Sequence, residues 1–236
     1  MKCLIITLAV CFLSTTLIAQ VSTSEKEALI DLYSSTNGDS WNNSWDLNSP
    51  VKDWTGISVE DNKVISIKLL FNNIEGELPA TLGDLEYLQV LELSFNKLSG
   101  TIPSELGNLK ELKVLAFNGN DLTGEIPASI GELTNLTQLH LSSNKLSGEL
   151  PESIADLEKL VVLNVFDNDL SGNLPSKLAY SKSIKELMVA ENNFKPSNEF
   201  SSIVLSNSAS VKLENPFYNF ELDEKQIIAN EIEEEN

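Results

Sequence analysis

A block of 24 residues recurs six times along the chain, and its columns align without a gap. Each copy holds two apolar residues separated by one position, and an asparagine follows three residues later. Self-similarity at a fixed period of about 20–50 residues is typical of stacked coils, none of which can bury its apolar side alone. The repeat therefore predicts a stack of coils. Its first apolar column consists of Ile67, Leu91, Leu115, Leu139, Leu163 and Leu187.

Each copy predicts three short elements. The apolar pair alternates with other residues, which predicts a short strand with both apolar side chains pointing inward. A proline recurs later in the copy, and the residue before a proline is restricted to extended backbone, which favours a second short strand on one flank. The Leu-Gly-x-Leu stretch after the proline predicts a helical turn on the outer side. The recurring prolines are Pro79, Pro103, Pro127, Pro151 and Pro175.

The asparagine column predicts a structural ladder along the stack. An amide side chain donates and accepts hydrogen bonds at once. It can therefore pair with backbone groups of its own and of the neighbouring coil that would otherwise be buried without partners. The ladder residues are Asn72, Asn96, Asn120, Asn144, Asn168 and Asn192.

One copy, from Leu88 to Leu109, carries the whole pattern L-x-x-L-x-L-x-x-N-x-L-x-G-x-I-P-x-x-L-G-x-L. On this motif the chain resembles the leucine-rich repeat family in its plant-type variant, over roughly residues 25 to 195. The resemblance implies an α/β solenoid, a right-handed superhelix with a concave parallel β-sheet and a helical N-terminal cap. It also implies recognition of a partner, often by a secreted binder or an ectodomain, without naming the ligand.

The chain is expected to divide into five segments. Residues 1–19 read as a signal peptide, because a short basic start precedes an apolar run shorter than the about 20 residues of a membrane span; an uncleaved anchor is the alternative. Residues 20–63 form the N-terminal cap, and residues 64–195 the six repeats. Residues 196–222 hold a degenerate last repeat and a C-terminal cap, in which Val211 and Leu213 fit a seventh strand. Residues 223–236 form an acidic tail, and we expect a secreted or cell-surface protein.

The N-terminal cap is expected to combine a helix with aromatic burial. Ser24 and Glu27 have the spacing of a capping box at a helix start. The resemblance places cysteines in this cap, but Ser58 stands at the expected position. Both cysteines of the chain lie in the expected signal peptide, which leaves the mature chain without a disulfide. All three tryptophans are expected to be buried over the first coil, namely Trp41, Trp45 and Trp54.

The charge balance restricts the classes of partner. The chain carries 16 lysines, no arginine and 35 acidic residues, for a net charge of -19. It therefore lacks the cationic face that nucleic acids and anionic membranes require. One histidine and two cysteines leave little material for metal binding or nucleophilic catalysis, and His140 has no carboxylate beside it in its column to orient a base. We expect a monomeric, non-enzymatic protein without cofactor or metal.

The outward positions of the predicted strands are the candidate binding site. They vary from copy to copy on a constant core, as a recognition surface on a fixed frame requires. Exposed apolar clusters mark contact sites, so Leu70, Phe71, Phe95 and Phe166 are the strongest pointers. We expect an apolar face over the first two repeats and an acidic face over the fifth and sixth. The candidate ligand-binding residues are Lys68, Leu70, Phe71, Glu92, Phe95, His140, Phe166, Asp167, Met188 and Glu191.

The partner expected at this face is a protein, a peptide or a glycan. The alternative is a structural or adhesive surface protein without one specific ligand. Binding to ice or another crystal surface ranks last, because it requires a flat array of like small residues. The flank column is instead mixed and charged, with Glu77, Thr101, Glu125, Glu149 and Asn173.

Overall fold

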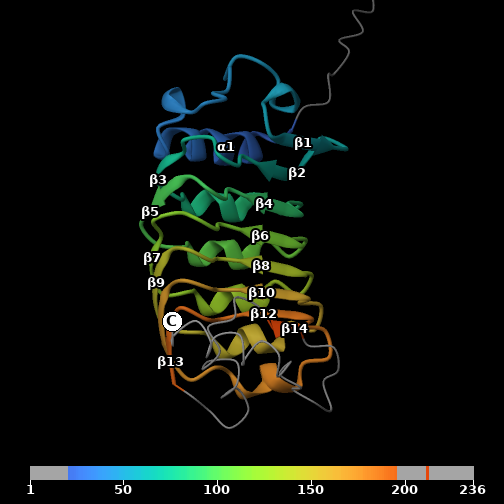
Figure 1. The fold of residues 1–236 in the computed structure, drawn as a ribbon. Helices are drawn as coiled ribbons and strands as arrows, with labels where there is room; N and C mark the ends of the chain where they lie inside the picture. Colours follow the sequence, from blue (N-terminus) through green and yellow to red (C-terminus); the bar gives the residue numbers. More distant parts are fainter. Residues whose placement is uncertain (1–20, 196–210, 213–236) are drawn as a thin grey trace, which may run out of the picture.

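The computed structural model describes residues 21–195 and 211–212, which form a stack of coils (Figure 1). Successive coils add strands to a main sheet and to a flank, and short 3-10 helices to a separate row. The predicted solenoid with a parallel sheet and a helical N-terminal cap is thereby confirmed. The expected signal peptide, most of the degenerate repeat and the acidic tail lie outside the described residues. In the described part of the chain, no helix has the length and apolar character to cross a membrane.

The main sheet contains eight strands in the order β1-β2-β4-β6-β8-β10-β12-β14. Strands β2 to β12 are parallel and pair residue for residue, so the apolar column of the sequence becomes a row of buried neighbours. The bounds are β1 (Ile57–Glu60), β2 (Lys63–Lys68), β4 (Val90–Glu92), β6 (Val114–Ala116), β8 (Gln138–His140), β10 (Val162–Asn164), β12 (Glu186–Met188) and β14 (Val211–Lys212).

Pairing is antiparallel at both ends of the main sheet, between β1 and β2 and between β12 and β14. Val211, predicted to lie in a seventh strand, does lie in a strand, but β14 runs against the direction of the coils. The repeat pattern fails just before it, because Pro196 and Glu199 replace the glycine and the proline of the other copies. Leu213 lies outside the described residues.

The flank strands follow the ladder asparagines, and all but β13 include or adjoin a glycine of the recurring column. Gly100, Gly124, Gly148 and Gly172 have φ between 73° and 81°, a left-handed conformation that side chains with a Cβ rarely adopt. The flank strands are β3 (Glu75–Glu77), β5 (Lys97–Ser99), β7 (Thr123–Gly124), β9 (Lys145–Glu149), β11 (Asp169–Gly172) and β13 (Asn193–Phe194).

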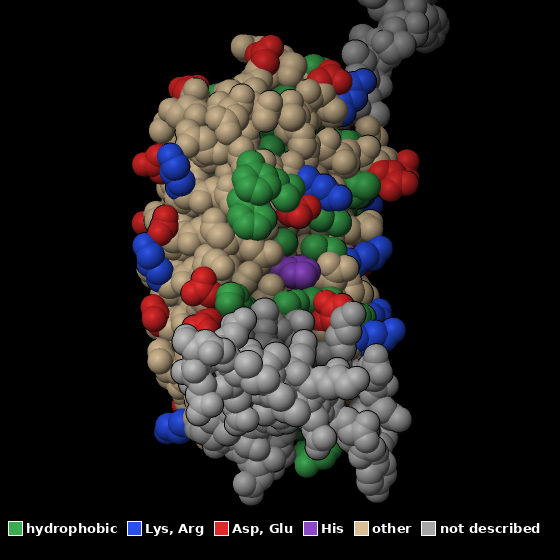
Figure 2. All heavy atoms as spheres, viewed as in Figure 1, with side chains coloured by type: hydrophobic (Ala, Val, Ile, Leu, Met, Phe, Trp, Pro, Cys, Tyr) green, Lys and Arg blue, Asp and Glu red, His purple; other side chains and the backbone are tan. Residues whose placement is uncertain are grey.

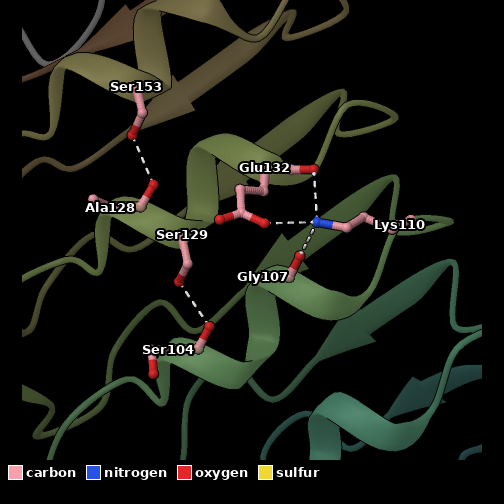
Figure 3. Close-up of polar contacts among 7 residues, drawn as sticks. All are labelled: Ser104, Gly107, Lys110, Ala128, Ser129, Glu132 and Ser153. Atoms are coloured by element: carbon pink, nitrogen blue, oxygen red, sulfur yellow. Dashed lines mark hydrogen bonds and ion pairs between the residues drawn. The ribbon is translucent and has the colours of Figure 1, made fainter.

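The predicted outer helical turns are 3-10 helices, each beginning directly after a column proline. Neighbouring turns approach so closely that a Cβ added to Gly107 would lie 2.6 Å from the carbonyl oxygen of Ser129. The hydroxyl of Ser129 donates to the carbonyl of Ser104 over 2.7 Å, one of the contacts between coils in Figure 3. The bounds are η3 (Ala80–Asp84), η4 (Ser104–Asn108), η5 (Ala128–Glu132), η6 (Glu152–Asp156) and η7 (Ser176–Tyr180).

The N-terminal cap consists of α1 (Thr23–Ser35), the 3-10 turns η1 (Gly38–Ser40) and η2 (Val51–Asp53), and β1. The predicted tryptophan burial is confirmed, since Trp41, Trp45 and Trp54 are at most 5% exposed. Neighbouring aromatic rings of this cluster lie 4.8 and 4.9 Å apart between centroids. Each indole N–H also donates to a backbone carbonyl, so the rings are buried without an unpaired polar atom.

The capping box of α1 lies two residues earlier than predicted. Ser22, not Ser24, is the N-cap, and Glu25, not Glu27, completes the reciprocal pair. The Glu25 carboxylate is buried, and its Oε1 also accepts a hydrogen bond of 2.9 Å from the backbone N–H of Val64 in β2. This tertiary bond decides between two equally spaced Ser-x-x-Glu pairs, because only Glu25 faces the first coil of the stack.

The ladder asparagines connect successive coils through both ends of the amide. Asn120 Nδ2 donates to the carbonyls of Phe117 in its own coil and Leu93 in the preceding coil, over 2.9 and 3.1 Å. Its Oδ1 accepts from the backbone N–H of Leu98 over 3.0 Å. Asn96, Asn144, Asn168 and Asn192 repeat the same arrangement. At the cap junction Asn72 differs, because its Oδ1 accepts from Asn43 and its buried Nδ2 has no partner.

Candidate functional site

The main sheet presents a regular array of outward side chains, which we call the sheet face. Each coil supplies four positions, and in the first coil these are Ser66, which is buried, and Lys68, Leu70 and Phe71, which are exposed. The parallel register places the corresponding residues of successive coils side by side. In the view of Figure 2, apolar side chains protrude from the upper part of this face, one carboxylate lies directly beside them, and further carboxylates lie lower on the face.

The most prominent feature of the sheet face is a stacked aromatic pair. The rings of Phe71 and Phe95 lie 4.6 Å apart between centroids with an interplanar angle of 4°. They remain 65% and 48% exposed. Large apolar side chains at such exposure are isolated on most surfaces, whereas these two form one cluster with Leu70 beside them in the sequence.

Both phenylalanines have a backbone conformation that their residue type disfavours. Their φ values are 50° and 58°, in the left-handed region where a bulky residue is an outlier. The same position is left-handed in four further coils, where it is occupied by Gly119, Ser143, Asp167 and Glu191. The coil geometry therefore imposes this conformation, and glycine or asparagine would meet it at lower cost. Backbone strain of about 1–3 kcal/mol per residue persists mainly where function uses it.

The surface steps down beyond the aromatic pair. The Phe95 ring lies over Gly119, where an added Cβ would come within 2.8 Å of the ring. The next residues on the face are small or polar, with Ser143 exposed and Asn118 half-buried. Asn118 Oδ1 accepts hydrogen bonds of 2.9 Å from both the backbone N–H and the hydroxyl of Ser142, so the orientation of this amide is fixed.

Carboxylates dominate the charge of the sheet face. Asp167 and Glu191 occupy the same position in neighbouring coils, and both are exposed. Glu92 and Glu186 stand further back on the face, and the only lysine at its outward positions in residues 66–191 is Lys68. The face therefore carries four carboxylates against one ammonium group, which makes it complementary to a cationic partner.

His140 lies near the centre of the sheet face, where Figure 2 shows the histidine in purple. Burial lowers its pKa below the ordinary value, and the negative charges of Glu92 and Glu186 oppose this effect only in part. The two carboxylates belong to coils two steps away on either side, and the ring nitrogen Nε2 lies 3.2 Å from Gln138 Oε1. The ring therefore holds a second proton less readily than a free imidazole, and it has no carboxylate bonded to it that would orient a catalytic base.

The sheet face brings some predicted residues together and separates others. Phe71 and Phe95 form one apolar group, with exposed Leu70 next to Phe71 in the chain, and the stacking was not foreseen from the sequence. Phe166, predicted to be exposed, is half-buried and does not join this group, because three coils separate it from Phe95. Met188 is also half-buried. In the described ranges, no three acidic, histidine or cysteine side chains gather as a metal site would require.

A second surface feature lies at the edge between the cap and the first coils. Two adjoining depressions share Ser24, Asp84, Glu86 and Tyr87 in their walls. The ammonium group of Lys63 lies 3.4 Å from the centroid of the Tyr87 ring, so this aromatic face is already covered by a cation of the chain. The Ser22 hydroxyl donates to the Glu25 carboxylate over 2.7 Å in the wall of one depression, but this carboxylate is already held by the capping box and by the N–H of Val64. Nothing in the sequence indicates these depressions.

The comparisons with known proteins agree with this geometry. The pattern described as Leucine Rich Repeat matches residues 87–109, 111–133 and 135–157. The solved BIR3–SERK2 complex from Arabidopsis thaliana contains a chain that is 35% identical, with a TM-score of 0.61 over 72% of this chain and 95% of that chain. The PEPR1–AtPEP1 structure is 34% identical with a TM-score of 0.69, over 73% of this chain and 25% of that one.

A plant ice-binding protein of known structure is also similar, at 28% identity and a TM-score of 0.67. The match covers 74% of this chain and 58% of the ice-binding protein. The chain thus spans about a quarter of PEPR1 and somewhat more than half of the ice-binding protein. A search of curated proteins by sequence gave no match.

Proposed function

The chain belongs to the leucine-rich repeat family, and on this basis we propose that it is a secreted or cell-surface, non-enzymatic module that recognises a partner through its sheet face. The candidate partners are a protein, a peptide or a glycan, and a peptide or protein fits the face best. Two of the similar structures are complexes of one protein with another molecule, as their names state. Fold similarity alone does not assign a ligand, so the proposal rests on the face itself.

One observation carries the proposal, namely the stacked and exposed pair of Phe71 and Phe95 on a left-handed backbone. The two residues violate the local preference of their position, and no buried core requires them there. Violations of a local rule concentrate at functional sites. Aromatic residues also contribute disproportionately to binding energy when a partner covers them.

The proposal is tested by capturing partners from the extracellular fluid of the source. Phe95→Glu places a charge in the apolar group, so one saturable partner should bind the parent chain and be lost with this variant. Tyr180→Glu is the matched control, because Tyr180 is as exposed as Phe71, at 65%, and stands at the end of η7. A partner that binds all three chains equally contradicts the assignment of the sheet face.

The alternative is an adhesive or structural surface protein without one specific ligand. It predicts many weak contacts that are insensitive to Phe95→Glu, whereas the main proposal predicts one saturable contact. The similarity to an ice-binding protein raises a further candidate. The flank nevertheless carries ion-paired Lys145 and Asp121 beside Glu125 and Glu149, which is not a flat array of like groups. We expect no inhibition of ice recrystallisation by the purified chain, and clear inhibition would favour that candidate.

A further inference from the structure

The chemistry of the partner can be narrowed from three zones of the sheet face, and this step rests on the proposed function. The first zone is the aromatic pair. The Phe95 ring is held between Phe71 and the backbone of Gly119, so its exposed edge has a fixed position. Covering this edge removes apolar surface from water, which stabilises a complex in proportion to the area buried. The first zone therefore accepts an apolar side chain of the partner.

The second zone is the low, polar stretch over the third to fifth coils. Asn118 Oδ1 is occupied by Ser142, and Asn164 Oδ1 accepts from the backbone N–H of Phe166. These bonds fix both amides so that their Nδ2 hydrogens remain as donors. A polypeptide backbone offers carbonyl acceptors at regular intervals. The second zone therefore suits the main chain of an extended segment better than it suits a further bulky side chain.

The third zone is the exposed carboxylate pair of Asp167 and Glu191. Neither forms an ion pair within the part of the chain that the structure describes. Both stand in the same left-handed column as Phe71 and Phe95, with φ of 57° and 55°. Two carboxylates in adjacent coils match a guanidinium or ammonium group of a partner, and the net charge of the rest of the face, from Glu92, Glu186 and Lys68, has the same sign.

The register fixes the separation between the zones. Phe95, Gly119, Ser143 and Asp167 occupy one column in consecutive coils, and neighbouring strands lie about 4.8 Å apart. Three steps give about 14 Å between the aromatic and the acidic positions, and an extended chain covers this distance in about four residues at about 3.3 Å each. We infer that the sheet face binds an extended peptide segment that carries an apolar side chain and, about four residues away, a lysine or arginine.

The inference is tested with synthetic peptides in which one phenylalanine and one lysine are separated by a variable serine-glycine spacer. Their affinities for the purified chain are measured over a series of salt concentrations centred on about 0.1 M. Affinity should peak at a separation of about four residues. It should fall about tenfold or more when glutamate replaces the peptide lysine, since each tenfold corresponds to about 1.4 kcal/mol.

Variants of the chain separate the two ends of the site. Asp167→Asn/Glu191→Gln should flatten the salt dependence and abolish the preference for lysine, whereas Phe71→Asn/Phe95→Asn should lower the affinity at high salt. The matched control is Glu125→Gln/Glu149→Gln, which removes the same charge from the flank and should change neither property.

The outcomes distinguish this inference from the proposed function. A flat spacing profile, or equal binding of lysine and glutamate peptides, overturns the inference. If the natural partner still depends on Phe95, the proposed function survives that failure, and the partner then engages the face in another form. If neither the peptides nor the natural partner depends on Phe95, both fail together.

Discussion

The side-chain oxygen of Asn120 accepts a hydrogen bond of 3.0 Å from the backbone N–H of Leu98, 22 residues earlier and one coil away. The amide nitrogen of the same residue donates to two carbonyls that both lie in the buried interior. One side chain thus satisfies the strand end of its own coil and the flank start of the preceding one. The ladder keeps successive coils in the same register, and the outward columns of the sheet face line up only when this register is kept.

Asn120→Ala should lower the free energy of unfolding by about 1–3 kcal/mol, since it leaves buried backbone groups unpaired. Urea unfolding followed by circular dichroism measures the change. The control is Asn173→Ala, because Asn173 is exposed on the flank, and it should stay within about 0.5 kcal/mol. Asn118→Ala is unsuitable as a control because Asn118 accepts a hydrogen bond from Ser142. Equal losses for Asn120→Ala and Asn173→Ala would refute the ladder.

Glu25→Ala should destabilise the cap by about 1–3 kcal/mol, because the buried N–H of Val64 loses its acceptor. Glu27→Ala is the matched control on the same helix, and its side chain is exposed. The Glu27 change should be small, within about 0.5 kcal/mol. Thermal unfolding of both variants decides the issue, and a larger effect of Glu27→Ala would restore the capping box expected from the sequence.

Gly107→Ala should destabilise the chain, against the usual trend for a glycine in a helical turn. Alanine has the higher helix propensity by about 1 kcal/mol, but its Cβ would lie 2.6 Å from the Ser129 carbonyl oxygen. Forcing the coils apart typically costs about 1–3 kcal/mol. A rise in the unfolding midpoint would show that the close approach of η4 and η5 is not a constraint.

The stability contributed by neutral His140 should depend on pH. Burial lowers its pKa below the ordinary value of 6.5, so the unfolded chain takes up this proton more readily than the folded one. The contribution is fully present above pH 6.5 and is lost as the pH falls through the lowered pKa. The difference in unfolding free energy between the parent and His140→Gln, measured at a series of pH values, should shrink over this range. A difference independent of pH would contradict the assignment.

Local periodicity predicts the regular part of this molecule well. The main-sheet strand, the flank strand and the outer turn are each predicted by residues that recur in every copy, because these residues have the same local surroundings in every coil. The cap is harder, since Ser22–Glu25 and Ser24–Glu27 have the same spacing and only the contact with Val64 separates them. The site is harder still. Phe95 and Phe166 are the same residue type at outward positions of the repeat. Phe95 nevertheless stacks on Phe71 and stays exposed, whereas Phe166 is half-buried. The direction of β14 could not be predicted, because the repeat pattern ends before this strand and no longer determines how the chain runs.

The central claim is that Phe71 and Phe95 serve binding rather than folding, and Phe71→Asn/Phe95→Asn tests it most directly. Asparagine tolerates the left-handed conformation of both positions, so relief of strain should offset the lost stacking, which is worth about 0.5–1.5 kcal/mol. The measurement is the unfolding free energy of the double variant together with its affinity for the captured partner. The account predicts stability within about 1 kcal/mol of the parent and affinity reduced about tenfold or more. Unchanged affinity with a large loss of stability would contradict it.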